Sequence, residues 1–368
     1  MTLVFYISGH GFGHAARSTQ LIAEVRRREP AIRVVIRTQV PEWFLRTSLD
    51  AGVSIVPGAT DTGVVQPDSL TIDEAATAAR AAAFYREFDA HTAREAAFLR
   101  REQASLVVAD IPPVAFAAAA VAGVPSVAFG NFTWDWIYSG FPGFDLAAPG
   151  VRERIREAQR QATQTLRLPF AGGFEGMANI FDVPLVGRRA TRSRADVRAR
   201  LGLDDARPVV LATFGGHGGN VPLTAAADNR EFLLVATDYE AGRTTPAHPN
   251  LRVVRGADLE HAALTYTDLL GACDVVATKL GYGIVSECLL NGVPLLYALR
   301  EHFIEQEVFI REMPAVMRAQ FISREDLRTG HWAPAVRALL AQPAPPSSPR
   351  HDGVSTSADR LLALAHGG

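Results

Sequence analysis

The chain has 368 residues, which is too long for one ordinary domain and predicts two. Hydrophobic residues make up 48% and charged residues 21%, proportions that are typical of globular proteins and argue against disorder. The net charge of −2 argues against a general nucleic-acid binder, because such proteins are usually basic. The two cysteines match neither the number nor the spacing of a disulfide framework or a zinc site.

The N-terminus is typical of a first β-strand and not of a signal peptide, because residues 1–7 contain no basic segment and no small-residue cleavage site. The most apolar stretch, residues 114–129, is interrupted by Gly123 and Pro125 and is short for a membrane span. We therefore expect a cytoplasmic protein without a membrane-spanning helix. The sequence does not indicate an oligomeric state.

The first half of the chain alternates short apolar runs with amphipathic stretches. Strands are expected at residues 3–7, 33–37, 53–56, 106–109 and 126–129. Helices are expected at residues 16–28, 42–51, 71–101 and 114–122. Buried strands that alternate with helices predict an α/β fold with a mainly parallel sheet and right-handed crossovers.

The pattern breaks at residues 169–184, which contain Pro and Gly. We interpret this segment, together with residues 181–194, as a connector, after which a second alternation of strands and helices begins. Strands are expected at residues 209–213, 232–236, 251–254, 275–277 and 295–297, and helices at 284–291 and 305–313. The Pro- and Ser-rich residues 342–353 predict a linker, and residues 357–365 a last helix that crosses back to the first domain. We thus predict two Rossmann-like, doubly wound domains, residues 1–185 and 186–345, then a linker and helix, residues 346–368. Ligands are expected in the cleft between the domains.

Three glycines at alternate positions occupy the turn after the first predicted strand, in Ser8-Gly-His-Gly-Phe-Gly-His14. They let the backbone turn sharply and approach a ligand, and the free amides of the following helix favour an anion. The spacing matches neither a dinucleotide fingerprint nor a P-loop. A histidine in such a turn can act as a general base, and we hypothesise this role for His14, with His10 as the alternative. The competing interpretation is that both cap the helix or bond the backbone.

Asp110 ends the buried strand 106–109, on the same edge of the sheet as the loop with the histidines. A carboxylate there can hold a histidine in one tautomer and stabilise its protonated form, as in a His–Asp dyad. The competing interpretation is an aspartate that caps the next helix.

Residues 278–287 repeat the pattern of strand, Gly-rich turn and helix. The turn at Gly281 and Gly283 can cradle a diphosphate at the helix N-terminus, while Lys279 adds charge and Ser286 a hydroxyl. Glu287, expected in the first helical turn, can accept hydrogen bonds from ribose hydroxyls. The competing interpretation is a capped helix with a structural glutamate.

Aromatic side chains with polar tips gather in residues 131–138, which follow a strand end. Such side chains suit a sugar or an aromatic acceptor, although an interdomain core patch is the competing interpretation. The predicted acceptor-binding residues are Asn131, Trp134, Asp135 and Trp136, with Trp43 on a second loop.

The second half of the chain resembles the donor-binding domain of GT-B glycosyltransferases. The resemblance rests on the segments 279–283, 286–287, 292–294 and 305–306. The layout is similar to that of the enzymes that add N-acetylglucosamine to peptidoglycan precursors. The motifs 8–14, 131–138 and 279–283 also resemble the glycosyltransferase-like region of plant L-arabinokinases, so the likeness covers nearly the whole chain.

The resemblance implies a role for each motif. Glu287 would bind the donor ribose, Glu305 and Gln306 would touch the donor sugar, and His14 would be the base with Asp110 as its partner. The expected donor-binding residues are Gly11, Gly13, Phe214, Gly215, Gly216, Lys279, Gly281, Tyr282, Gly283, Ser286, Glu287, Glu305 and Gln306.

The resulting hypothesis is a glycosyltransferase that moves a sugar from a nucleotide-diphosphate sugar to an acceptor hydroxyl with inversion. UDP is the donor nucleotide that the resemblance implies, and the acceptor would be a small-molecule, lipid-linked or natural-product hydroxyl. No Asp-x-Asp metal motif occurs in the chain, so neither a metal nor another cofactor is expected. Two alternatives stay open, a nucleotide-sugar 2-epimerase or hydrolase and a non-catalytic nucleotide-sugar-binding module.

Overall fold

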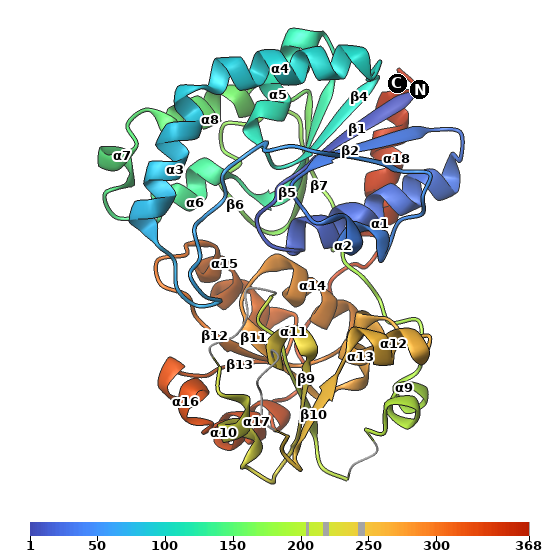
Figure 1. Ribbon diagram of the computed structural model, residues 1–368, viewed down its shortest axis with the longest axis vertical. Helices are drawn as coiled ribbons and strands as arrows, with labels where there is room; N and C mark the ends of the chain where they lie inside the picture. The colour runs from blue at the N-terminus through green and yellow to red at the C-terminus, as the bar shows by residue number, and fades with distance from the viewer. Residues whose placement is uncertain (204–205, 216–220, 242–246, 368) are drawn as a thin grey trace.

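The computed structural model describes residues 1–203, 206–215, 221–241 and 247–367. It has two α/β halves, one above the other in Figure 1, and each is built on a parallel sheet. This confirms the predicted architecture of two Rossmann-like domains.

Among the described residues, seven parallel strands form the first sheet in the order β3-β2-β1-β4-β5-β6-β7. The strands are β1 (Thr2–Ile7), β2 (Arg33–Thr38), β3 (Ser54–Pro57), β4 (Leu106–Asp110), β5 (Ser126–Phe132), β6 (Gln164–Gly172) and β7 (Ile180–Asp182). The helices of this half are α1 (Gly13–Arg28), α2 (Glu42–Arg46), α3 (Glu74–Arg86), α4 (Phe88–Arg101), α5 (Pro113–Ala122), α6 (Trp134–Ser139), α7 (Phe144–Ala147) and α8 (Val151–Gln159). The strand order reverses between β1 and β4, and such a switch point is where doubly wound sheets bind ligands.

The second sheet has six parallel strands within the described residues, in the order β10-β9-β8-β11-β12-β13. They are β8 (Val209–Ala212), β9 (Leu233–Thr237), β10 (Leu251–Val254), β11 (Val275–Lys279), β12 (Leu295–Ala298) and β13 (Ala319–Phe321). The helices are α9 (Arg194–Leu201), α10 (Leu223–Ala227), α11 (Asp238–Ala241), α12 (Gly256–His261), α13 (Tyr266–Ala272), α14 (Tyr282–Asn291), α15 (Glu305–Glu312), α16 (Arg324–Thr329) and α17 (Ala333–Leu340). In this sheet the strand order reverses between β8 and β11. The second Gly-rich turn directly follows β11 in the sequence.

The strands are apolar on both faces because each sheet is covered on both sides. In β1, Phe5 and Ile7 face one core while Val4 and Tyr6 face another, and all four are buried. The core on the Phe5 side continues into the second half, where it includes Val285 of α14. The two halves therefore share part of one apolar core.

Two sequence-based expectations about the first half were wrong. The stretch 71–101, expected as one helix, forms α3 and α4 with a break at Glu87, whose φ of −103° and ψ of 16° are not helical. The break lets Phe88 pack against Val114 and Ala117 of α5. Residues 169–184, expected as a connector, instead complete β6 and form β7 at the edge of the first sheet. Neighbouring strands decide this pairing, and the local sequence does not show it.

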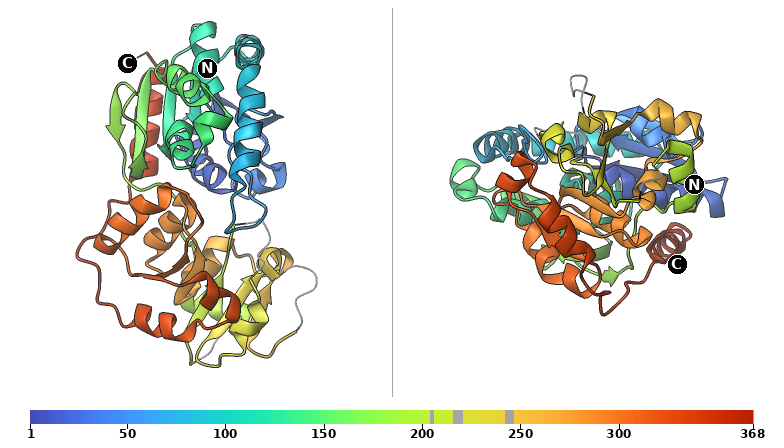
Figure 2. Two further views of the ribbon diagram at one scale, coloured as in Figure 1. Left: turned by 90° about the vertical axis from the view of Figure 1, so that its left-hand side faces the viewer. Right: turned by 90° about the horizontal axis from the view of Figure 1, so that it is seen from below.

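The last helix, α18 (Gly353–Ala365), crosses back and packs along α1, as expected (Figures 1 and 2). Its Leu361 is fully buried in the core that both halves share. Arg28 of α1 forms an ion pair with Asp359 and donates a hydrogen bond of 2.6 Å to the Ser355 hydroxyl. The end of the chain thereby holds the helix that begins at the first Gly-rich turn.

We expect the Leu361→Ala variant to lower the free energy of unfolding by about 2–4 kcal/mol, because it leaves a cavity in a packed core. Leu362, which is only partly buried, is the matched control, and Leu362→Ala should cost clearly less. Urea unfolding of both variants measures the difference. Equal losses in the two variants would show that α18 does not pack through Leu361.

Candidate functional site

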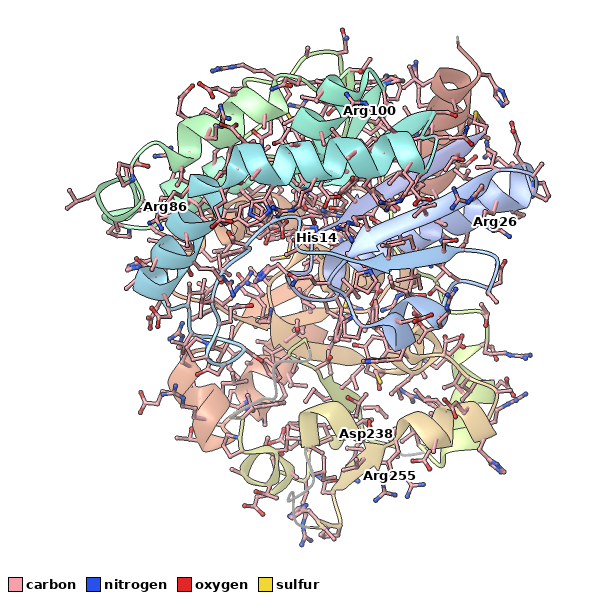
Figure 3. The ribbon with its side chains drawn as sticks, turned by 45° about the horizontal axis from the view of Figure 1, so that its top comes forward. His14, Arg26, Arg86, Arg100, Asp238 and Arg255 are labelled. Atoms are coloured by element: carbon pink, nitrogen blue, oxygen red, sulfur yellow. The ribbon has the colours of Figure 1, made fainter. Side chains whose placement is uncertain are left out.

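A cavity of about 830 Å³ lies between the two halves at the carboxyl ends of the parallel strands. This volume is typical of small-molecule sites, and the position is the one expected for doubly wound sheets. In Figure 3, His14 lies near the centre of the molecule while the labelled arginines lie toward its outside. The first half contributes the turn after β1 and the end of β5, and the second half the turns after β8, β11 and β12.

Most of the residues predicted from the sequence line this cavity. They are His10, Gly11, Gly13, His14, Trp43, Asn131, Phe214, Gly215, Lys279, Gly281, Tyr282, Gly283, Glu287 and Glu305. Gly216 lies outside the described residues. The structure therefore brings together motifs that stand near opposite ends of the chain.

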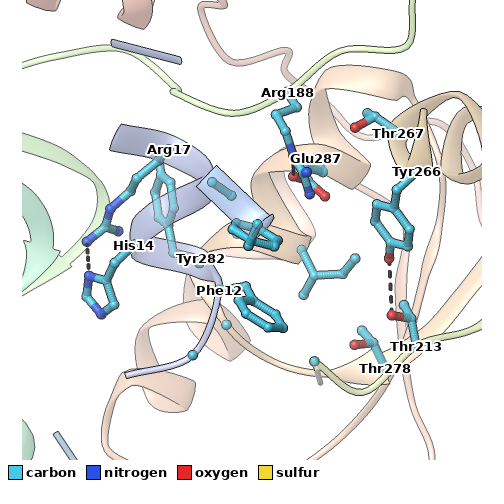
Figure 4. A pocket seen from close by; sticks show the side chains of 18 of the residues that line it. Phe12, His14, Arg17, Arg188, Thr213, Tyr266, Thr267, Thr278, Tyr282 and Glu287 are labelled. Carbon is cyan, nitrogen blue, oxygen red and sulfur yellow. Dashed lines mark hydrogen bonds and ion pairs between the residues drawn. The ribbon is translucent and has the colours of Figure 1, made fainter. Parts of the chain in front are cut away.

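The two Gly-rich turns touch each other at the cavity. A Cβ atom added to Gly283 would lie 3.1 Å from the Cα of Gly13, closer than most side-chain contacts. Gly283 thus lets the N-termini of α1 and α14 approach across the boundary between the halves. Figure 4 shows α1 with His14 and Arg17 on one side and Glu287 with Tyr266 on the other.

His14 and Asp110 form the predicted pair. The Nδ1 atom of His14 lies 2.7 Å from Oδ1 of Asp110, and the two residues are 5% and 1% exposed. Asp110 ends β4, which pairs with β1, so the strand register places it beside the turn that carries His14. Asp110 itself does not line the cavity.

Arg17 and Ser18 complete the surroundings of Asp110. Arg17 donates from Nε to Oδ2 over 2.7 Å and from Nη2 to Oδ1, and the Ser18 hydroxyl donates to Oδ2 over 2.8 Å. Burial raises the pKa of Asp110, but the charges of Arg17 and His14 and their hydrogen bonds outweigh it, and the pKa falls to about 2. The carboxylate is therefore ionised at neutral pH.

An ionised Asp110 selects one tautomer of His14. Arg17 Nη2 also lies 3.1 Å from Nδ1, but the carboxylate is nearer and can only accept a hydrogen bond. The pairing favours a proton on Nδ1, which leaves Nε2 with a lone pair. This is the arrangement that a histidine needs to act as a general base.

The predicted nucleotide side of the cavity is also built from paired groups. Arg188, from the connection between the halves, donates from Nε to Oε1 of Glu287 over 2.5 Å. Its guanidinium lies 5.9 Å from the ring centre of Phe44 and 5.6 Å from that of Tyr266. The Tyr266 hydroxyl donates to Thr213 Oγ1 over 3.1 Å (Figure 4).

Some donor residues predicted from the sequence lie elsewhere than expected. Glu287 is in the second turn of α14 and not the first, because the helix already begins at Tyr282. Ser286 donates to the Gly283 carbonyl over 2.9 Å, and Gln306 bonds the backbone of Arg300; neither lines the cavity. These two side chains bond the backbone of the turns beside the cavity.

The predicted acceptor residues of α6 also do not reach the cavity wall. Trp134 is buried and donates from its indole to Asp61 over 3.0 Å, while Asp135 accepts from Arg156 over 3.0 Å. Trp136 packs over Gly172 and Gly173 of the first sheet. The position of α6 does not support direct acceptor binding by Trp134, Asp135 or Trp136. The aromatic wall is formed instead by Phe12, Trp43, Phe44 and Phe132.

Sequence reasoning missed several polar residues that line the cavity, among them Arg17, Arg188 and Arg300. It also missed Asp61, which does not line the cavity but accepts a hydrogen bond from the indole of Trp134. Arg17 and Ser18 follow His14 by three and four positions, so helical spacing could have placed them on one face. Burial raises the pKa of Asp61 and lowers that of Arg300 to about 10. The sequence around Asp61 and Arg300 shows no periodic pattern that would have identified them.

Among the described residues, no helix combines the length and apolar character needed to cross a membrane. In the same residues, no three side chains of His, Cys, Asp or Glu are grouped so that they could hold a metal ion.

The chain is related in sequence to two groups of sugar-handling proteins. It is 32% identical to L-arabinokinase of Arabidopsis thaliana over 93% of this chain, which is 32% of that protein. It is 30% identical to the UDP-N-acetylglucosamine–N-acetylmuramyl-(pentapeptide) pyrophosphoryl-undecaprenol N-acetylglucosamine transferase of Clavibacter michiganensis, over 54% of this chain and 55% of that protein. The chain thus spans about a third of the first relative and about half of the second.

The fold is similar to that of solved glycosyltransferases. The calicheamicin glycosyltransferase CalG4 matches with a TM-score of 0.64 and 19% identity, over 99% of this chain and 98% of that one. No protein-family model matches the sequence. The two facing Rossmann-like halves, the cavity between them and these similarities show that the chain has the GT-B glycosyltransferase fold.

Proposed function

We propose that this protein transfers a sugar from a UDP-sugar to an acceptor hydroxyl, with inversion at the anomeric carbon and His14 as the base. One observation carries the proposal. A histidine bonded to an ionised carboxylate lines the same cavity of about 830 Å³ as a Gly-rich helix start. The relationship to a UDP-N-acetylglucosamine transferase supports the choice of donor.

The base removes the acceptor proton in the proposed reaction. As the acceptor oxygen attacks the anomeric carbon, its proton passes to Nε2 of His14. The bond between the anomeric carbon and the diphosphate oxygen breaks with its electron pair, and UDP leaves. Asp110 stabilises the imidazolium that forms, because its carboxylate lies 2.7 Å from Nδ1.

The second half would bind the donor. The amides at the start of α14 and the ammonium of Lys279, which line the cavity, would stabilise the charge that develops on the diphosphate. Glu287 would accept hydrogen bonds from the ribose, and Arg188 would then exchange its present partner for the ligand. The acceptor would be a small-molecule, natural-product or lipid-linked hydroxyl that packs on the aromatic wall of Phe12, Trp43 and Phe44.

We expect the His14→Ala variant to lower the transfer rate about 10³-fold, a loss typical of removing a general base. His10→Ala is the matched control and should cost less than about tenfold, because the imidazole that lies 2.7 Å from Asp110 is that of His14. UDP binding, measured by calorimetry, should survive in both variants, because the base does not hold the nucleotide. Full activity in folded His14→Ala protein would exclude His14 as the base.

Incubation with donor alone separates transfer from its two rivals. A transferase leaves the UDP-sugar largely intact until an acceptor is added. An epimer or free sugar formed from donor alone would instead indicate an epimerase or hydrolase. UDP binding without product in the presence of any acceptor would indicate a binding module.

Lys279 is the only lysine of the chain, which allows a direct test of the donor site. Reductive methylation with ¹³C-formaldehyde labels its amine and the N-terminal amine and keeps both charges. We expect UDP to shift the NMR signal of the dimethylated Lys279, since the side chain lines the cavity, while uridine shifts it much less. The Lys279→Arg variant, which lacks this signal, identifies the resonance. A Lys279 signal unmoved by saturating UDP would contradict the assignment.

A further inference from the structure

We propose that Asn131 is a positioning residue that fixes Glu305, on the donor side, to the hydrogen-bond network of the base, on the other half of the molecule. The inference rests on the proposed transfer reaction. It reassigns Asn131 from acceptor binding to the alignment of the two halves.

Asn131 is completely buried at the end of β5 and joins residues of both halves. Its Oδ1 accepts a hydrogen bond of 2.6 Å from Nη1 of Arg17. Its Nδ2 donates over 2.8 Å to Oε1 of Glu305, the first residue of α15. A chain of buried hydrogen bonds therefore runs from His14 through Asp110, Arg17 and Asn131 to Glu305.

The chemistry of the two neighbours dictates the orientation of the Asn131 amide. A guanidinium can only donate, so the amide oxygen must face Arg17. The amide nitrogen then faces the carboxylate of Glu305, which accepts its hydrogen bond. An aspartate at position 131 would set two carboxylates against each other, and an apolar residue would leave both neighbours without this partner.

The position of Glu305 matters because the base and the donor sugar belong to different halves. Proton transfer and attack need reacting atoms about 3 Å apart, and small misplacements are costly. Oε2 of Glu305 forms an ion pair with Arg300, 3.7 Å from Nη2, which is too long for a hydrogen bond. Asn131 thus holds one oxygen of Glu305, while the other, paired with Arg300, can still accept a hydrogen bond from a sugar hydroxyl.

A double-mutant cycle tests the link. Asn131→Asp should lower kcat about 100-fold with little change in the KM for donor. The two carboxylates at positions 131 and 305 would repel each other, and Glu305 would leave the position in which it is linked to the network of the base. Glu305→Gln alone should cost less, since its amide oxygen can still accept from Asn131. In the double variant, the new amide at position 305 donates to the new carboxylate at position 131, which also accepts from Arg17. We therefore expect kcat to recover at least about tenfold over Asn131→Asp.

A matched control separates this link from the general cost of burying an aspartate. Asn250 is also buried, and its amide donates to the carbonyls of Ala227, Asn229 and Phe232, residues that do not line the cavity. The Asn250→Asp variant should be less stable than the wild type, and addition of Glu305→Gln should not restore its stability. Unfolding midpoints of all variants, measured in parallel, test the same coupling without relying on activity.

The proposal is supported if kcat and the unfolding midpoint both fall in Asn131→Asp and both recover in the double variant. If the unfolding midpoint recovers in the double variant but kcat does not, Asn131 has only a structural role and the proposal is overturned. The proposal is also overturned if neither quantity is higher in the double variant than in Asn131→Asp. If Asn131→Asp does not fold, a double variant that folds and is active supports the link, and one that folds without activity overturns it. If neither folds, Asn131→Ser should lower kcat at least about tenfold, and an unchanged kcat overturns the inference. A wild-type protein inactive with every donor contradicts the proposed function, whereas an active wild type without rescue of kcat in the double variant overturns the positioning role alone.

Discussion

The buried carboxylate of Asp110 is the constraint on which the rest of the site depends. A charge without contact with water is costly unless its partners are close and well oriented. Here the partners are His14, Arg17 and Ser18, all on the first two turns of α1. The carboxylate therefore requires α1 to begin directly after the Gly-rich turn. It also requires β4 to run beside β1 in the observed register, in which Asp110 is the partner of Ile7.

Close approach of backbone segments shapes the cavity as much as polar pairing does. Gly13 and Gly283 meet at the starts of α1 and α14, where a side chain on Gly283 would press on the opposite backbone. The shared apolar core and the packing of α18 along α1 stabilise this close approach of the two helix starts.

Each of the three acids assigned to the proposed reaction has a partner in the structure. Asp110 pairs with Arg17 and His14, Glu287 with Arg188, and Glu305 with Asn131. Since a buried charge must keep its hydrogen bonds, a ligand that binds Glu287 must replace those of Arg188. The stacking of Arg188 near Phe44 and Tyr266 links this exchange to both halves of the molecule. Nucleotide binding and domain alignment are therefore coupled in the proposed reaction.

The amino-acid sequence predicts the local features of this protein. Apolar runs and Gly-rich turns predicted most strands, and the end of a strand predicted that Asp110 would meet His14, because parallel strands share one edge. The tertiary structure alone decided that residues 164–182 extend the first sheet, that Trp134 and Trp136 face the core, and that Arg188 and Asn131 join the halves. The physical reason is that periodicity reports which face of an element is apolar. It does not report which distant element covers that face, and a buried arginine or asparagine depends on the partner that folding brings to it.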